Sequence, residues 1–201
     1  MHYDIGFADL CYNQKCIFVK VVNIYPWLSG VQMGRHIIIA GKRKIGKTTL
    51  VDRLLERFSG PVYGFRTAPG ESMKKGYRSF FIHPAGSEDW TETEDNHIGD
   101  GNGIQPVAYP EAFDGYGVKC LEAEPDGIIV MDELGFMERD AERFCSRVLE
   151  LFDGDIPILA TAKSGHDIEF LNKLLNHPNA DVYYITIENR DELYEILKNR
   201  F

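Results

Sequence analysis

The stretch Gly41-Lys-Arg-Lys-Ile-Gly-Lys-Thr48 lies between an apolar run and an amphipathic one. Before it, Ile37-Ile-Ile-Ala40 is typical of a buried strand. After it, apolar residues recur from Leu50 to Phe58 at helical spacing, which predicts a helix over 47–58. A strand, a glycine-containing loop and a helix are therefore expected in that order.

The eight residues match the pattern GxxxxGK[ST], which binds phosphate groups when a strand precedes it and a helix follows. Its glycines let backbone N–H groups surround an anion, and the helix N-terminus adds its positive end. Lys47 would reach the β- and γ-phosphates of a nucleotide, and the Thr48 hydroxyl would be a ligand of Mg²⁺. The alternative is a basic turn without a ligand. The nucleotide-binding residues predicted by the motif are Gly41, Lys42, Arg43, Lys44, Ile45, Gly46, Lys47 and Thr48.

Outward from this unit, short apolar runs alternate with amphipathic stretches, which predicts an α/β fold with a mostly parallel sheet flanked by helices. Further buried strands are expected at 127–132, 156–161 and 182–187, each followed by a helix. Residues 62–67 and 77–83 are expected to pair as an antiparallel hairpin. The acidic, glycine-rich segment 86–103 is interpreted as a mobile surface loop. Asn189 and Glu192 have capping-box spacing before the last helix.

Two carboxylates end the apolar strand Ile128-Ile-Val-Met-Asp132-Glu133. Ligands of open α/β sheets bind at the carboxyl ends of the strands. Asp132 would hold Mg²⁺ or its water, and Glu133 would act as the general base that activates the attacking water. The alternative is that Glu133 only caps or pairs at the strand end. A group that activates water favours hydrolysis over transfer to another acceptor.

Three more polar residues are candidates for contacts with the γ-phosphate or the transition state. Thr161 ends the next apolar strand, where Lys163 is an alternative for the same role. Arg78 and Arg190 are candidates to neutralise transition-state charge or to contact the nucleotide. Each of these has a simpler explanation, because threonines often satisfy local backbone and exposed arginines are usually solvated.

Composition limits the partners of the chain. The 201 residues carry 22 Lys and Arg against 31 Asp and Glu, a net charge of -9. This charge repels phosphate polymers, so general nucleic-acid binding is not expected. An anionic ligand must therefore be held locally, and the cations of the 41–48 loop provide such a place. The substrate expected is a nucleoside triphosphate, ATP or GTP, and the sequence names no protein partner.

Length and composition predict one domain with an extension. We interpret 34–201 as the main domain and 1–33 as an N-terminal extension, in which the alternation of Ile17, Val19 and Val21 suggests an added strand or a poorly ordered segment. Four scattered cysteines predict neither a disulfide framework nor a zinc site. The apolar stretch 16–28 is too short to span a bilayer, and no signal-peptide pattern is recognised. A cytoplasmic protein is expected.

Four segments together resemble a known family, the small nucleoside-triphosphatases first described from thermophiles, which include a human cancer-related member. They are residues 41–49, residues 62–67 with 76–78, Ile129-Val-Met-Asp-Glu-Leu-Gly-Phe-Met-Glu138, and residues 158–161 with 182–191. The resemblance implies a RecA-like three-layer P-loop fold and slow, Mg²⁺-dependent hydrolysis of ATP, GTP and other nucleoside triphosphates to diphosphate and phosphate.

Carried over residue by residue, the resemblance implies phosphate and metal binding by Gly46, Lys47, Thr48 and Thr49. It also implies metal binding by Asp132 and water activation by Glu133, whereas Gly135 and Glu138 would have turn and structural roles. Two other functions stay open. The same phosphate cradle serves nucleotide or polynucleotide kinases, and a nucleotide-switched binding module would use its acidic segment and N-terminal extension as partner surfaces.

Overall fold

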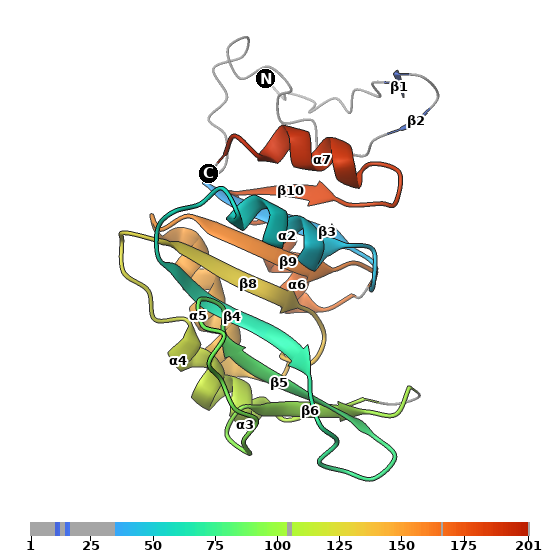
Figure 1. The fold of residues 1–201 in the computed structure, drawn as a ribbon, viewed down its shortest axis with the longest axis vertical. Helices are drawn as coiled ribbons and strands as arrows, with labels where there is room; N and C mark the ends of the chain where they lie inside the picture. Colours follow the sequence, from blue (N-terminus) through green and yellow to red (C-terminus); the bar gives the residue numbers. More distant parts are fainter. Residues whose placement is uncertain (1–10, 13–14, 17–34, 104–105, 166, 201) are drawn as a thin grey trace, which may run out of the picture.

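The computed structural model describes residues 11–12, 15–16, 35–103, 106–165 and 167–200 (Figure 1). Two short strands near the N-terminus, β1 (Cys11–Tyr12) and β2 (Lys15–Cys16), pair with each other in a separate sheet. The remaining strands are β3 (His36–Gly41), β4 (Val62–Pro69), β5 (Arg78–Pro84), β6 (His97–Gly101), β7 (Val107–Ala108), β8 (Ile128–Leu134), β9 (Ile158–Lys163) and β10 (Ala180–Tyr184). The helical segments are α2 (Lys47–Leu55), α3 (Pro110–Ala112), the π-helical η1 (Phe113–Gly117), α4 (Val118–Cys120), α5 (Glu142–Asp153), α6 (Glu169–Leu175) and α7 (Arg190–Leu197).

Strands β3 to β10 form one sheet in the order β10-β3-β9-β8-β4-β5-β6-β7. Neighbours from β10 to β4 are parallel, and β4 to β7 are antiparallel. The hairpin predicted for 62–67 and 77–83 is formed by β4 and β5, with Thr67 opposite Ile82. The mostly parallel half follows from the alternation of strands and helices, because parallel neighbours need a crossover helix.

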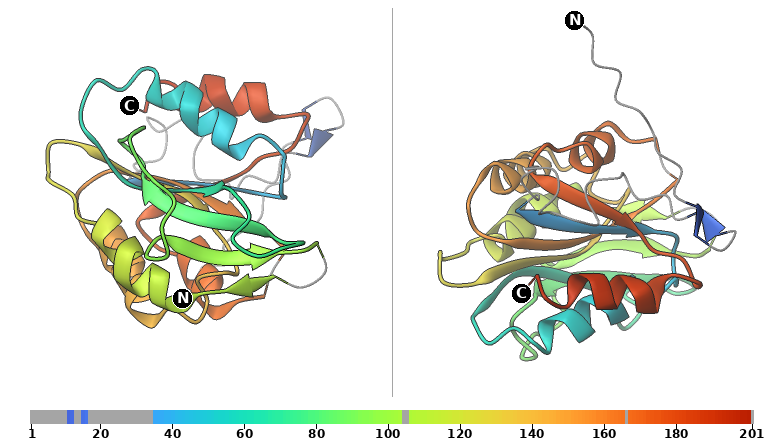
Figure 2. Two further views of the ribbon diagram at one scale, coloured as in Figure 1. Left: turned by 60° about the horizontal axis from the view of Figure 1, so that its bottom comes forward. Right: turned by 90° about the horizontal axis from the view of Figure 1, so that it is seen from above.

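Helices cover both faces of the sheet (Figure 2). On one face, α2 and α7 pack through Leu50, Val51 and Leu193 against Ile37 and Ile39 of β3. On the other face, α5, α6 and the α3–η1–α4 segment build the larger cluster. Since successive side chains of a strand point to opposite faces, a fully buried strand such as β3 belongs between two helical layers. The predicted three-layer α/β fold is confirmed.

The order of the strands decides where the predicted motifs meet. Strand β9 stands between β3, which leads into the 41–48 loop, and β8, which carries Asp132 and Glu133 near its carboxyl end. All three strands are parallel, so their carboxyl ends lie at one edge of the sheet. The phosphate loop and the two carboxylates therefore lie at the same edge of the sheet, although they belong to different strand–helix units.

The interpretation of residues 86–103 as a surface loop is wrong for its second half. Residues 97–101 form β6, and the side chains of Ile98 and Asp100 are buried. Ile98 packs into the larger core cluster. The error arose because acidic and glycine residues surround a single apolar residue, so the alternation typical of a strand is absent from the sequence.

The capping box predicted for Asn189 is also wrong. The Asn189 side chain accepts a hydrogen bond from the Thr186 backbone N–H (2.7 Å) and donates one to the Tyr184 carbonyl (2.9 Å), and it makes no cap bond to α7. These bonds close a turn directly after β10, which ends at Tyr184 instead of continuing to residue 187. The first helix likewise ends at Leu55, before the predicted Phe58.

The predicted strand around Ile17, Val19 and Val21 lies outside the described residues. We propose that residues 34–201 fold as a domain without 1–33, because the two core clusters of the described residues lie within β3 to α7. Deleting residues 2–32 is expected to change the free energy of unfolding by no more than about 1 kcal/mol, a small part of the 5–15 kcal/mol typical of a domain. Urea unfolding followed by circular dichroism measures this, and loss of a cooperative transition would contradict the proposal.

Within the described residues, none of the helices combines the length and the apolar character that crossing a membrane requires.

Candidate nucleotide-binding site

The 41–48 loop has the backbone conformation of an anion cradle. Gly41 ends β3, and Gly46 precedes the first residue of α2 with φ +106°, in the left-handed region that favours glycine. Lys44 also has a positive φ, 61°. Gly46, the N-cap residue of α2, has no side chain to cap the helix, and the first turn of α2 contains no acidic residue. The N–H groups at this helix end are therefore not blocked by a carboxylate and can bind phosphate oxygens.

Lys47 is held over this loop. Its ammonium group donates hydrogen bonds to the carbonyls of Gly41 (3.0 Å) and Lys42 (2.8 Å). It also lies 3.2 Å from Glu133 Oε2, and its side chain is only 2% exposed. The charge of Lys47 is thus fixed between the phosphate loop and the end of β8. In contrast, the side chains of Lys42, Arg43 and Lys44 are exposed.

Asp132 accepts two hydrogen bonds near the carboxyl end of β8. The Thr161 hydroxyl donates to Asp132 Oδ1 at 2.6 Å, and the Thr48 hydroxyl lies 3.3 Å from the same atom. Burial raises the pKa of the Asp132 carboxyl, and the bonds from Thr161 and Thr48 and the charge of Arg66 oppose this rise. Thr161 is fully buried, so it faces Asp132 instead of the open cavity where a phosphate would bind. The structure gives it a positioning contact.

Glu133 lies between two ammonium groups. Its Oε2 is 3.2 Å from Lys47 Nζ, and its Oε1 is 3.3 Å from Lys163 Nζ at the end of β9. The side chain of Glu133 is 18% exposed and lines the cavity beside the phosphate loop. The alternative that Glu133 pairs at the strand end is therefore present in the structure as two ion pairs. The same carboxylate also faces the space where a γ-phosphate and water would lie.

Arg66 was not assigned any role from the sequence. It stands on β4 directly opposite Asp132 of β8, with its guanidinium 3.6 Å from Asp132 Oδ2 and 2.8 Å from Asp52 Oδ1 of α2. Arg66 thereby links the phosphate-loop helix to the carboxylate of β8. The only signal in the sequence is a charged residue inside a strand pattern, and the register between β4 and β8 cannot be read from that signal.

Turn residues after Glu133 have the structural role that was predicted for them. The buried Glu138 accepts a hydrogen bond from the Gly135 backbone N–H and closes the turn that carries Phe136 and Met137. Burial raises the pKa of Glu138 to about 6. A Cβ on Gly135 would lie 3.0 Å from the Lys163 side chain, so glycine leaves room for the lysine beside Glu133.

A cavity of about 640 Å³ joins these parts, and a volume of this size suits a small-molecule site. Lys42, Arg43, Thr48, Asp132 and Glu133 line it, so the structure brings these predicted residues together. Arg78 lines its far end. Arg190 is exposed at the start of α7 and is not among the lining residues.

The donor atoms of this cavity suit Mg²⁺. The ion prefers hard oxygen ligands and usually keeps several waters, so it needs only one or two protein carboxylates besides the phosphates of a substrate. The Thr48 hydroxyl and the Asp132 carboxylate are such oxygens, 3.3 Å apart, and both line the cavity. Among the described residues, no group of three or more His, Cys, Asp or Glu side chains could hold a metal by itself.

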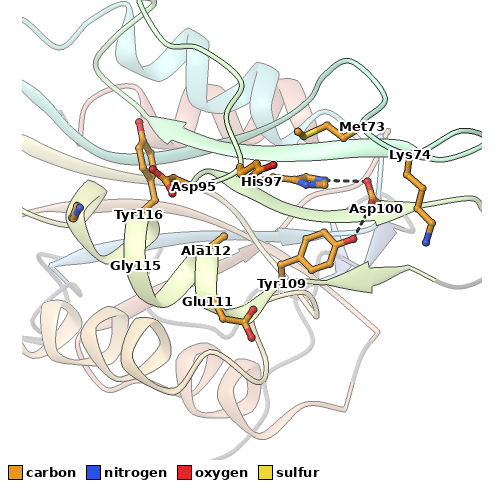
Figure 3. Close-up of a pocket in the computed structure, with 12 residues that line it drawn as sticks. Met73, Lys74, Asp95, His97, Asp100, Tyr109, Glu111, Ala112, Gly115 and Tyr116 are labelled. Carbon is orange, nitrogen blue, oxygen red and sulfur yellow. Dashed lines mark hydrogen bonds and ion pairs between the residues drawn. The ribbon is translucent and has the colours of Figure 1, made fainter.

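A second cavity of about 760 Å³ lies beside β6 and the α3–η1 segment (Figure 3). Buried Asp100 accepts hydrogen bonds there from the hydroxyls of Ser79 (2.6 Å) and Tyr109 (2.7 Å), and it contacts His97 Nε2 at 3.0 Å. Burial favours the neutral acid, but these three bonds lower the pKa of Asp100. The network ties β5, β6 and the residue after β7 together, which explains why the 97–101 segment is ordered.

A glycine-containing loop between a strand and a helix, next to carboxylates near the carboxyl end of a parallel strand, defines a P-loop protein. The family model described as NTPase matches residues 36–197, so the chain belongs to this NTPase family, as the resemblance implied.

Relatives named nucleoside-triphosphatase THEP1 support the assignment. The one from Methanocaldococcus jannaschii is 30% identical over 173 residues, which cover 82% of this chain and 96% of the relative. The one from Natranaerobius thermophilus is 32% identical, covering 82% and 95%.

Two solved structures share the fold. The crystal structure of THEP1 from Aquifex aeolicus has a TM-score of 0.60 at 22% identity and covers 81% of this chain and 96% of its own. The solution structure of a human cancer-related nucleoside triphosphatase has a TM-score of 0.56 at 21% identity, covering 82% and 96%.

Proposed function

We propose that the chain is a Mg²⁺-dependent nucleoside-triphosphatase that hydrolyses ATP, GTP and other nucleoside triphosphates to diphosphate and phosphate. The observation that carries the proposal is the position of Glu133. Its carboxylate lies at the cavity between Lys47 and Lys163, next to Asp132. A nucleotide with its phosphates in the loop would have its terminal phosphate in front of this carboxylate. The cytoplasm, where such nucleotides are abundant, is the compartment that we propose for this activity.

In the proposed reaction, residues 41–49 bind the phosphate chain. The N–H groups at the start of α2 and the Lys47 ammonium contact the β- and γ-phosphates. To do so, Lys47 exchanges its bonds with the Gly41 and Lys42 carbonyls for bonds with phosphate oxygens. Glu133 then keeps Lys163 as its partner. Substrate binding would thus weaken the contact between the Lys47 ammonium and Glu133 that is present in the unbound protein.

Glu133 is proposed as the general base. A water molecule between Glu133 and the γ-phosphate would form the new bond to phosphorus and transfer a proton to the carboxylate. The bond from the γ-phosphorus to the bridging oxygen of the β-phosphate breaks, and the diphosphate leaves. Thr48 and Asp132 would hold Mg²⁺, and Thr161 and Arg66 would position the Asp132 carboxylate. When bound, the ion neutralises charge on the phosphate oxygens.

Phosphate release from ATP and from GTP tests the proposal. We expect release in the presence of MgCl₂ and a decrease of about 10²-fold or more when EDTA removes the metal, because charge stabilisation by such an ion amounts to several kcal/mol. Adding MgCl₂ in excess over EDTA should restore the rate. Hydrolysis at the same rate with and without the metal would contradict the metal dependence, and absence of release from all triphosphates would contradict the function.

A further inference from the structure

The cavity beside the phosphate loop continues past the carboxylates of β8. Its far half is lined mainly by residues of the antiparallel strands and of η1. They are Thr67 of β4, Arg78 and Phe80 of β5, Ile98 of β6 and Phe113 of η1. Because β4 and β5 are antiparallel, the end of β4 and the start of β5 meet at the same edge as Asp132, with Pro69 opposite Phe80. The far half is therefore continuous with the proposed active site.

The order of the strands shows how far this half lies from the loop. Strand β5 is two strands beyond β8 and four strands beyond β3. At a spacing of about 4.8 Å, β5 lies about 10 Å from β8 and about 19 Å from β3 across the sheet. Along the strand, His83 is level with Asp132 through Arg66, so Arg78 lies five residues, about 17 Å, further towards the end of the cavity. Arg78 thus belongs to a different part of the cavity from Lys47, and the transition-state contact predicted for it would have to bridge this separation.

A nucleotide in the loop would not fill the far half. This step rests on the proposed function, in which Glu133 faces the γ-phosphate. The phosphate chain then ends in front of β8, and the nucleoside lies at the opposite end of the chain. The space beyond Glu133 is left for another molecule, which would face the γ-phosphate from the other side.

The chemistry of the far half favours an anion with a flat apolar body. The half-buried Phe80 provides aromatic surface, and aromatic rings stack well on flat rings. Ile98 and Phe113 also line this half but are almost fully buried, so they lie behind that surface as part of the core. Arg78 provides a guanidinium group, which binds phosphate or carboxylate in two parallel hydrogen bonds. Within the described part of the chain, no carboxylate lies within ion-pair distance of Arg78. In a chain with a net charge of -9, such a cation is a selective contact for an anion.

We propose that this far half is a binding site for a second small molecule, one that joins a flat ring to a single anionic group. Nucleoside monophosphates and aromatic carboxylates both have this chemistry. The ring would lie against Phe80, and the anionic group would bind Arg78, two residues earlier on the same face of β5. The whole cavity of about 640 Å³ falls in the range of sites for small organic molecules.

Isothermal titration calorimetry tests the site on the full chain. The protein is first saturated with Mg²⁺ and a nonhydrolysable GTP analogue, and then titrated separately with AMP, GMP, CMP and UMP and, in a second arm, with 4-hydroxybenzoate. At least one probe is expected to bind with a stoichiometry of one. Arg78→Gln should weaken that binding by about 10-fold or more, since hydrogen bonds to charged groups contribute about 1.5–3 kcal/mol. Phe80→Leu, which keeps an apolar side chain, should weaken ring binding without unfolding the strand.

Arg57→Gln is the matched control, because Arg57 is exposed just beyond the C-terminal end of α2. The same titrations are repeated without the GTP analogue on the Lys47→Ala and Arg78→Gln variants. They show which half of the cavity binds the probe. Binding that depends on Lys47 but not on Arg78 would place the probe in the phosphate loop and overturn the inference. Absence of binding by every probe would also overturn it. Binding of the GTP analogue alone is measured first, so a failure of the proposed function is seen independently.

Discussion

Replacing Glu133 with glutamine is expected to lower the turnover number for phosphate release by about 10²–10⁴-fold, the contribution typical of a general base. Glutamine keeps the size and one oxygen of the side chain but cannot accept the proton of the attacking water. Nucleotide affinity should be kept or increased, because the change removes the negative charge that lies 3.2 Å from Lys47 and 3.3 Å from Lys163. Turnover is measured by phosphate release, and affinity by titration with a nonhydrolysable analogue.

Glu142→Gln is the control for this variant. Glu142 is an exposed carboxylate at the start of α5, outside the cavity lining, and its loss should leave turnover within about twofold, as for most surface substitutions. Equal hydrolysis by wild type and Glu133→Gln would show that Glu133 is not the base. In that case its position between two lysines would have only the pairing role that was considered from the sequence.

Replacing Lys47 with alanine is expected to weaken triphosphate binding by about 2–5 kcal/mol, roughly 30- to 4,000-fold, as for loss of one partner of a buried charge pair. The Lys47 ammonium is 2% exposed and is positioned by the Gly41 and Lys42 carbonyls, so it is already aimed at the loop before a ligand binds. Equilibrium titration with a nonhydrolysable analogue measures the loss. Glu133 keeps its contact with Lys163, so the variant should still fold.

Lys42→Ala is the comparison for Lys47→Ala. Lys42 lies in the same loop and lines the same cavity, but its side chain is exposed. Exposed ion pairs contribute only about 0–1 kcal/mol, so this variant should bind nucleotide nearly as well as wild type. If both variants weakened binding equally, the general positive charge of the loop, and not the fixed ammonium of Lys47, would account for the affinity. Urea unfolding of both variants excludes a loss of fold as the cause.

The sequence predicts the part of the site that depends on neighbours along the chain. The 41–48 loop needs a strand before it and a helix after it, and both signals are local patterns of apolar residues. Asp132 and Glu133 were predicted at the end of β8 because an apolar run ends there. The three-layer fold follows from the same alternation of strands and helices.

Contacts between distant segments could not be predicted in this way. The bond from Thr161 to Asp132 depends on β9 lying next to β8, and the ion pair of Arg66 depends on the register of β4 against β8. A single sequence can indicate a hairpin such as β4–β5, but it does not show which strands joined by crossovers become neighbours. Thr161 was therefore only a candidate for contact with the γ-phosphate, with a local backbone role as the alternative, and Arg66 was assigned no role.

Predictions from local patterns were also wrong where a tertiary contact competes with the expected local structure for the same side chain. Asn189 has the spacing of a helix cap, but its side chain bonds to Thr186 and Tyr184 and closes a turn. Asp100 increases the acidity of a segment that looks like a loop, yet its buried carboxylate is satisfied by Ser79, Tyr109 and His97. In both cases the polar group finds its partners through tertiary structure, which composition does not reveal.

The position of β9 between β3 and β8 means that the two halves of the proposed nucleotide site are joined only in the assembled sheet. Lys47 and Thr48 follow β3, whereas Asp132 and Glu133 lie near the carboxyl end of β8, so the unfolded chain cannot offer both sets of groups to one ligand. A ligand that binds only the folded state raises the free energy of unfolding by about 2.7 kcal/mol when its concentration is 100 times its dissociation constant. The supply of nucleotide would thus set not only the rate of hydrolysis but also the fraction of the protein that stays folded.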